Sequence, residues 1–172
     1  GQRIADSTQV AGAYRTYEFD VTGTAVPGLN SLAVEVFAPE ANDLAIEWVD
    51  WNPAPPDKDM GIWRDVYLTT NGPVALRFPQ VITKLDLPAL DKAHLKVTAE
   101  LVNSLSKTVQ AALKGQIESV QFSQKTELAP NETRLVTFSP AEFPQLNISN
   151  PRLWWPVQDG AQNLYDMDRQ AV

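Results

Sequence analysis

Alternation of apolar and polar residues at a period of two is the feature that most constrains the fold of this chain. Successive side chains of a β-strand point to opposite faces, so this period predicts strands that bury one face. Helical periodicity is nearly absent from the sequence. The segments that we expect to form half-buried strands are residues 17–21, 32–37, 62–68, 95–102 and 133–138.

Turn residues separate these segments. The clearest turn signals are residues 26–30, 71–73 and 129–132, and the thirteen prolines are hard to place inside helices or central strands. Residues 110–118 include good helix formers, but Gly115 and the β-branched residues around it favour a strand over a helix. The sequence therefore predicts an all-β protein.

Composition narrows the functional class. The 172 residues are 44% apolar and 20% charged, which is typical of a soluble globular protein with one large or two small domains. A (β/α)8 barrel takes about 250 residues, so none fits in this length. The net charge of −7 argues against nucleic acid or an anionic membrane as a partner, because both need clustered Lys and Arg.

Metal and cofactor sites also lack sequence support. With no cysteine, the chain has neither disulfides nor thiolate ligands. The lone histidine, His94, stands at the start of an alternating segment, and one histidine does not make a metal site. The chain opens on Gly1-Gln2-Arg3-Ile4 without an apolar signal region, and no run approaches the length of a membrane span. We expect no metal, no cofactor and no membrane insertion, and we assign His94 no role.

The polar turn at residues 69–73 is the best domain boundary. Residues 73–172 hold six or seven strand candidates in about 100 residues, which predicts an immunoglobulin-like β-sandwich, although the Cys-Trp-Cys signature of antibody domains is absent. Residues 1–72 hold too few strands for an eight-stranded jelly roll, so we expect half a domain. The alternating residues 164–172 predict a strand that ends before its hairpin partner. Incomplete sheets have open edges, which favour dimers or strand exchange.

The most informative segment is residues 48–67, a proline-rich loop with acids and aromatics that leads into a predicted strand. Aromatic faces cover the C–H faces of a sugar ring, and carboxylates accept hydrogen bonds from its hydroxyls. Asp50 and the adjacent Trp51 supply both groups, which makes them candidate carbohydrate-binding residues. Trp48 and Trp63 are more simply explained as core residues of a sandwich.

Several stretches resemble glycoside hydrolase family 2. Asp50-Trp51-Asn52-Pro53 and Gly61-Ile62-Trp63-Arg64-Asp65-Val66-Tyr67-Leu68 look like the end of the sugar-binding jelly-roll domain of that family. Residues 12–21 resemble an earlier strand pair of the same domain, and residues 150–165 resemble the immunoglobulin-like domain that follows it. The amino-acid sequence around Asp50 most resembles the corresponding segment of exo-β-D-glucosaminidases. The β-mannosidases come second, because Val49 and Asn52 replace the Trp and Gly of their loop.

The resemblance implies a function for the parent protein. It implies a secreted or periplasmic retaining glycosidase that removes terminal β-glucosamine from chitosan oligosaccharides, or else a β-mannosidase or β-galactosidase. The catalytic carboxylates of the family lie on barrel strands, so we expect residues 1–172 to be a non-catalytic N-terminal part without catalytic residues of its own. Asp50 is expected to contact the terminal sugar, and Trp51 to shape its pocket. A carbohydrate-binding or scaffold module without an enzyme is the alternative from another class.

Three further motifs have simpler structural explanations. The pair Asn131-Glu132 lies between turn residues and predicts a hairpin turn rather than an acid/base site. For Arg64 and Asp65 we expect a structural ion pair or a carbonyl-bridging arginine rather than substrate contact. Asp57 and Asp59 are expected to be solvated turn acids. Trp154 and Trp155 are adjacent, so at most one of them can face a sandwich core. The sequence therefore predicts an exposed apolar patch at this pair.

Overall fold

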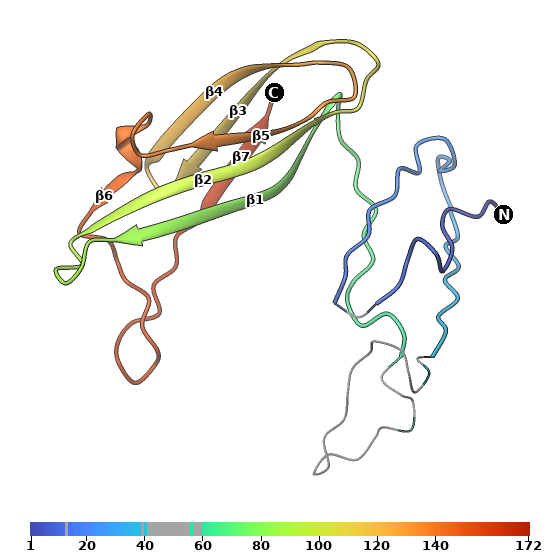
Figure 1. Ribbon diagram of the computed structural model, residues 1–172, viewed down its shortest axis with the longest axis horizontal. Coiled ribbons are helices and arrows are strands. Elements are labelled where there is room, and N and C mark those ends of the chain that lie inside the picture. The colour runs from blue at the N-terminus through green and yellow to red at the C-terminus, as the bar shows by residue number, and fades with distance from the viewer. Residues whose placement is uncertain (13, 39, 41–55, 57–59) are drawn as a thin grey trace. The chain divides into compact units, whose positions relative to one another are not determined.

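The computed structural model describes residues 1–12, 14–38, 40, 56 and 60–172 (Figure 1). The chain divides into two compact units, Gly1–Leu68 and Thr69–Val172. This division falls shortly before the boundary at residues 72 and 73 that we expect from the sequence, and the domain types assigned to the two parts stay predictions. None of the described helices is long and apolar enough to cross a membrane.

The second unit contains two antiparallel sheets. One has the order β1-β2-β5, with β6 also paired to β2, and the other has the order β4-β3-β7 (Figure 1). The described residues include no α-helix, so the predicted all-β class is confirmed. The elements are β1 (Val74–Leu85), β2 (Lys92–Asn103), β3 (Val109–Ile117), β4 (Val120–Leu128), β5 (Thr133–Phe138), the 3-10 helix η1 (Pro144–Leu146), β6 (Asn147–Ser149) and β7 (Met167–Ala171).

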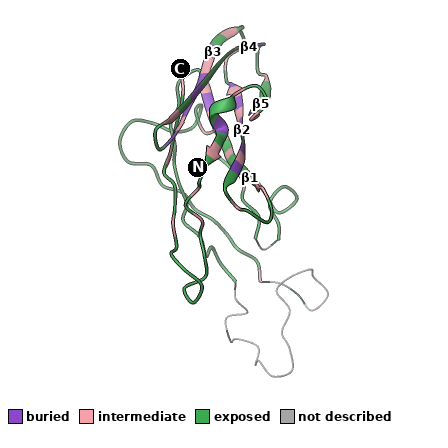
Figure 2. Cartoon of the chain, turned by 90° about the vertical axis from the view of Figure 1, so that its left-hand side faces the viewer, coloured by how far each residue is buried: buried purple, intermediate pink, exposed green. Residues whose placement is uncertain are grey.

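The core fills the space between the inner faces of these sheets. Every second residue of β2 from Ala93 to Asn103 is buried, as the predicted alternation requires (Figure 2). The ring of Phe122 on β4 lies 4.7 Å from that of Phe138 on β5, and Phe143 packs edge-on against Phe138 at 4.9 Å. Aromatic rings at these distances add to the free energy gained by burial.

The sequence pattern located β2 and β5 well, but it gave no clear signal for β1. The predicted strands at residues 95–102 and 133–138 correspond to β2 and β5. The segment 110–118 is covered by β3 up to Ile117, so it forms a strand rather than a helix. In β1 the register shifts between Arg77 and Gln80, where Phe78 has a φ of 44°. Pro79 stands inside this irregularity and has no N–H to donate. The bulge interrupts the alternation that would otherwise mark the strand.

The first unit differs from the sequence expectation. The described part of residues 1–68 carries no strand, so the strands predicted at 17–21, 32–37 and 62–68 are wrong in this structure. Most apolar side chains on these segments are exposed, among them Phe37 and Leu68. A strand forms only when a neighbour accepts its ladder hydrogen bonds, and no described neighbour does so here. The alternation indicates which side chains a strand would bury, but it does not show whether a neighbouring strand is present to form the hydrogen bonds.

Hydrogen bonds close two of the predicted turns, at residues 26–30 and 129–132. Asn30 closes the 26–30 turn, because its Oδ1 accepts a hydrogen bond from the N–H of Val26 at 3.0 Å and its Nδ2 donates to the Val26 carbonyl at 2.7 Å. Between β4 and β5 the Glu132 N–H donates to the Ala129 carbonyl at 3.2 Å, and Asn131 has a φ of 55°. The prediction that Asn131-Glu132 is a turn is therefore confirmed.

Candidate functional site

The two predicted substrate residues, Asp50 and Trp51, lie outside the described residues, as does Trp48. Their role in carbohydrate binding stays a prediction. The described part of the chain offers two other regions where aromatic side chains gather. One lies in the first unit around Trp63, and the other lies in the second unit around Trp154 and Trp155.

Trp63 is exposed, so its prediction as a core residue is wrong. Its indole has 61% of its surface accessible and meets the ring of Tyr14 edge-on, with centroids 5.6 Å apart. The guanidinium of Arg64 lies 4.5 Å from the centre of the indole. The residue stays at the surface because no described strand pairs with its segment to bury it. An exposed indole and a cation form a surface on which a sugar ring can stack.

Asp65 and Tyr67 continue this exposed segment. The hydroxyl of Tyr67 donates a hydrogen bond to Oδ2 of Asp65 at 3.3 Å. Arg64 thus contacts an aromatic ring and Asp65 accepts from a hydroxyl, so the ion pair or carbonyl-bridging arginine that we expect from the sequence stays a prediction.

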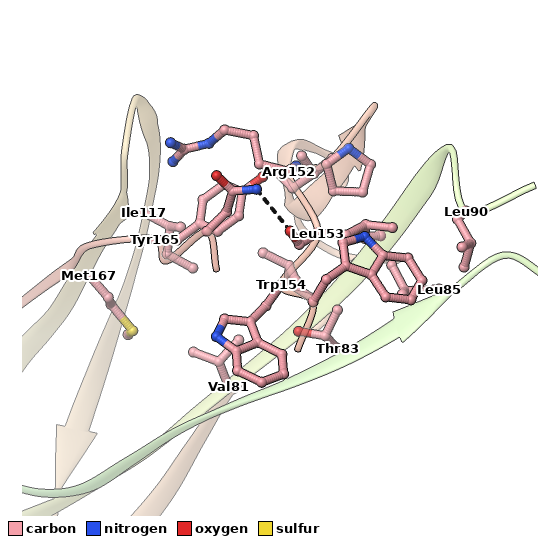
Figure 3. Close-up of a pocket in the computed structure, with 16 residues that line it drawn as sticks. Val81, Thr83, Leu85, Leu90, Ile117, Arg152, Leu153, Trp154, Tyr165 and Met167 are labelled. Atoms are coloured by element: carbon pink, nitrogen blue, oxygen red, sulfur yellow. Dashed lines mark hydrogen bonds between the residues drawn. The ribbon is translucent and has the colours of Figure 1, made fainter. Parts of the chain in front are cut away.

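The second region is an apolar groove at one end of the sandwich, with a volume of about 480 Å³. Val81, Thr83 and Leu85 from β1 face the segment that carries Leu153 and Trp154 (Figure 3). The remaining lining residues come from the turn after β1, from β2, β3, β6 and β7, and from residues 151–165. We call this groove the tryptophan groove. Its lining residues are Val81, Thr83, Leu85, Leu90, Ala93, Leu95, Ile117, Ile148, Pro151, Arg152, Leu153, Trp154, Trp155, Asn163, Tyr165 and Met167.

Both tryptophans of the groove are partly exposed. Trp154 has 54% of its surface accessible and Trp155 has 40%, so neither fills the core. The predicted exposed apolar patch at this pair is confirmed. Both residues belong to the long loop between β6 and β7, which extends beyond the strands of the second unit (Figure 1).

Backbone bonds within the loop hold the two tryptophans in place. Trp154 forms an isolated antiparallel bridge with Gln162, and the N–H of Trp155 donates to the Ala161 carbonyl at 3.0 Å. Asn163 donates from Nδ2 to the Leu153 carbonyl at 2.8 Å (Figure 3). These bonds connect the two arms of the loop to each other and so hold the tryptophans in position.

Gly160 allows the tip of this loop to fold over Trp155. A Cβ at this position would lie 3.1 Å from Cδ1 of Trp155 and 3.2 Å from two further atoms of the same side chain. Contacts this short require the indole to shift. Glycine is therefore needed here for close approach rather than for its backbone freedom.

Arg152 and Tyr165 form the polar rim of the groove. The N–H of Arg152 donates to the Tyr165 hydroxyl at 2.6 Å, and its guanidinium lies 4.7 Å from the centre of the Tyr165 ring. The same guanidinium donates from Nη2 to Oε1 of Glu118 at 2.8 Å and to the Leu164 carbonyl at 3.2 Å. Sequence reasoning did not single out Arg152 and Tyr165, and only their place in the 150–165 resemblance marked them.

Local hydrogen bonds lower the pKa values of three described carboxyl groups, those of Glu132, Asp6 and Asp20. The Ala129 N–H and then Arg134 lower the pKa of Glu132 below its ordinary value, which fits a turn residue and not an acid/base catalyst. Hydrogen bonds from Thr8 and Thr22 lower the pKa values of Asp6 and Asp20 in the same way. Among the described residues no group of three His, Cys, Asp or Glu side chains is placed to hold a metal ion.

Comparison with known proteins places this geometry in a family. The family model described as "Glycosyl hydrolases family 2" matches residues 74–170, which is more than half of the chain. An exo-β-D-glucosaminidase of Streptomyces avermitilis is 42% identical over 99% of the chain and 19% of its own length. A mannosylglycoprotein endo-β-mannosidase of Lilium longiflorum is 28% identical over 91% of the chain and 19% of its own length.

Solved structures agree with the sequence comparison. The crystal structure of an exo-chitosanase from Amycolatopsis orientalis matches with a TM-score of 0.87 and 36% identity over 99% of the chain. The chain spans only 21% of that protein and 19% and 16% of the first two curated relatives. A further matching structure is a complex of a single-substitution variant of this exo-chitosanase with p-nitrophenyl β-D-glucosamine. The chain belongs to glycosyl hydrolase family 2.

Proposed function

We propose that this chain is a non-catalytic part of an exo-β-D-glucosaminidase that hydrolyses terminal β-glucosamine from chitosan oligosaccharides. The observation that carries the proposal is the match along almost the whole chain to an exo-β-D-glucosaminidase at 42% identity. The exo-chitosanase structure, which superposes with a TM-score of 0.87, supports the same substrate class. A mannoside substrate has weaker support, because the mannosidase relative is 28% identical.

Hydrolysis itself is assigned to residues outside this chain. A retaining glycosidase needs two carboxyl groups roughly 5 to 5.5 Å apart, one as nucleophile and one as acid/base. In the proposed enzyme both belong to a barrel domain. Asp50 accepts hydrogen bonds from hydroxyls of the terminal sugar, and Trp51 packs beside it. These contacts raise kcat/KM by positioning the sugar.

The charge of the chain suits an amino-sugar substrate. Glucosamine carries a protonated amine at neutral pH, and the chain has 21 acidic against 14 basic residues. An excess of carboxylates draws a cationic oligosaccharide toward the protein and raises the association rate at low ionic strength. A neutral mannoside gains nothing from this field.

The tryptophan groove is proposed to pack against the barrel domain in the whole enzyme. Trp154, Trp155 and Val81 are exposed there beside partly buried aliphatic side chains, and exposed apolar surface of this kind marks an interface. Open sheet edges are a second contact surface, since β1 and β7 each pair with a single described strand. Dimerisation or strand exchange through these edges belongs to the proposal as well.

The enzyme is proposed to work outside the cytoplasm, in the periplasm or the medium. Chitosan oligosaccharides are polar and charged, so they do not cross a membrane unaided. Fractionation of the source cells with an antibody against this chain tests the location. Recovery of the protein in the cytoplasmic fraction alone would contradict it.

The test of the proposed function uses the full-length protein and chitosan oligosaccharides. The wild-type protein is expected to release glucosamine from the non-reducing end. Asp50→Asn is expected to lower kcat/KM on the order of 10- to 100-fold, because a hydrogen bond to a charged group is worth about 1.5 to 3 kcal/mol. Asp57→Asn removes the same charge from the same loop and is expected to leave kcat/KM nearly unchanged.

Other outcomes would favour other functions. Hydrolysis of β-mannosides but not β-glucosaminides would identify a mannosidase. Binding of chitosan oligosaccharide with no hydrolysis by the full-length protein would identify a binding or scaffold module. Equal activity of the Asp50→Asn and wild-type proteins would remove Asp50 from the site while leaving the reaction class intact.

A further inference from the structure

His94 connects the β1–β2 turn to β6 on the outer face of the four-stranded sheet. It lies on β2 between the core residues Ala93 and Leu95, so its own side chain points away from the core. Its Nε2 is 3.1 Å from Oδ1 of Asp86 in the turn between β1 and β2. Its Nδ1 is 2.5 Å from Oδ1 of Asn147, the first residue of β6.

The orientation of the Asn147 amide is fixed by its other contacts. Its Nδ2 donates to the Pro144 carbonyl at 2.9 Å and to the Pro140 carbonyl at 3.3 Å. Both acceptors are backbone carbonyl oxygens. A 180° flip of the Asn147 amide would place its Oδ1 against these two oxygens, with no hydrogen between them. The atom that meets His94 is therefore the amide oxygen, which accepts hydrogen bonds and donates none.

Both ring nitrogens of His94 thus face acceptors. A neutral imidazole has one N–H and one lone pair, so one of its nitrogens would meet an oxygen without a proton between them. The Asp86 carboxylate supplies no proton when it is ionised. The imidazolium form, with two N–H groups, is the single protonation state that satisfies both contacts.

We propose that His94 is a proton-dependent clamp, whose imidazolium holds the β1–β2 turn and β6 together and thereby fixes one wall of the tryptophan groove. Residues adjacent to each partner, Leu85, Ala93 and Ile148, line that groove from the opposite face of the sheet. β6 is three residues long and pairs with β2, which also carries His94. The loop with Trp154 and Trp155 begins directly after β6.

The charged groups around His94 set the direction of its titration. On β1, Lys84 lies opposite His94 in the strand register and disfavours the imidazolium, whereas Asp86 favours it. η1 and β6 carry no titratable side chain, and Lys92 and Lys96 flank His94 on its own strand. The hydrogen bond to Asn147, followed by that to Asp86, raises the pKa of His94 above its ordinary value of 6.5.

The sign of the pH effect follows from this direction. A group whose pKa is higher in the folded state stabilises that state fully below its unfolded pKa. This stabilisation disappears as the pH rises through the folded pKa. The clamp is therefore closed in mildly acidic solution and released in alkaline solution.

The protonation state is tested by NMR titration of the 172-residue chain, in which His94 is the only histidine. The imidazole resonance is expected to titrate above the value measured for the same chain in urea. Asp86→Asn should lower the midpoint, whereas Asp91→Asn, which removes the same charge from the same turn, should leave it nearly unchanged. A wild-type midpoint at or below the unfolded value, or equal shifts in the two variants, would overturn the proposal.

Release of the clamp is tested by amide hydrogen exchange. If deprotonation of His94 releases β6, the equilibrium constant for opening β6 must rise between low and high pH. The factor equals the acid dissociation constant of His94 in the opened form divided by that in the folded form. The amides of β3 and β4 correct for the intrinsic rise of exchange with pH. A His94→Gln variant should show no such increase. β6 protection that stays constant relative to β3 and β4 in the wild-type chain would refute a clamp even if the pKa is raised.

Discussion

Gly115 of β3 faces the ring of Phe122 on β4, its partner in the strand register. A Cβ at this position would lie 2.2 Å from Cε2 and 2.4 Å from Cζ of that ring. The ring has no room to retreat, because Phe122 is buried and packs against Phe138 with centroids 4.7 Å apart. Gly115→Ala therefore forces either the strand or the ring to move.

Two effects of opposite sign set the stability of the Gly115→Ala variant. Alanine restricts the unfolded chain, which favours folding by roughly 0.5 to 1 kcal/mol where the backbone accepts it, and Gly115 has no positive φ to prevent this. Overpacking a core costs about 1 to 3 kcal/mol. Because two ring atoms approach well within van der Waals contact, we expect a cost near the upper end, and a net loss of about 2 kcal/mol.

Urea unfolding followed by far-UV circular dichroism measures this loss. The signal reports on the second unit, which contains all the strands that the structure describes. Gly72→Ala is the matched control, because a Cβ at Gly72 has no neighbour within 4 Å. The control is expected to change the free energy of unfolding by less than about 0.5 kcal/mol, in the stabilising direction if at all.

A double variant separates steric conflict from a general loss of strand stability. Phe122→Leu removes the ring atoms that the new methyl group would strike, so adding it to Gly115→Ala should cost less than the sum of the two single changes. We expect a coupling of at least about 1 kcal/mol. Additive losses, or a Gly115→Ala variant as stable as the wild-type chain, would refute the packing argument.

Three further predictions concern other residues. Asn103→Ala should cost about 2 to 4 kcal/mol in urea unfolding, because the buried amide donates to two backbone carbonyls at 2.8 Å and accepts from an N–H at 2.9 Å; a loss under 1 kcal/mol would contradict this. Tyr165→Phe should cost about 1 kcal/mol and increase hydrogen exchange at the Arg152 amide, and unchanged exchange would count against that hydrogen bond. Glu132 has a lowered pKa, so its contribution to stability should disappear as the pH falls through its folded value. A Glu132→Gln variant with the wild-type acid dependence of thermal unfolding would exclude this contribution.

The sequence predicted the second unit better than the first. Residues 95–102 and 133–138 alternate without interruption and pair with each other in β2 and β5, so local pattern and tertiary structure agree. In the first unit the same kind of pattern is present, yet the described residues form no ladder. Alternation is a property of one segment, whereas a strand requires a hydrogen-bonded neighbour. Sequence reasoning has no access to that neighbour.

The candidate site shows the same limit. The pair Trp154 and Trp155 was recognisable from the sequence, because adjacent strand residues cannot both enter one core. The opposite wall of the tryptophan groove, with Val81 and Thr83, comes from β1 and meets the pair only through the fold. His94 was assigned no role, because one histidine does not make a metal site. Its partners Asp86 and Asn147 lie in the β1–β2 turn and in β6, and only the fold brings them to it.

Substrate preference of the full-length protein tests the proposed function most directly. We would measure kcat/KM for the p-nitrophenyl glycosides of β-D-glucosamine and β-D-mannose under identical conditions. We expect the barrel domain of the proposed enzyme to pair the amine with a carboxylate, and this would discriminate by on the order of 100-fold or more, because a mannoside leaves that carboxylate unpaired. The proposal predicts faster hydrolysis of the glucosaminide. Equal values, or a preference for the mannoside, would contradict it.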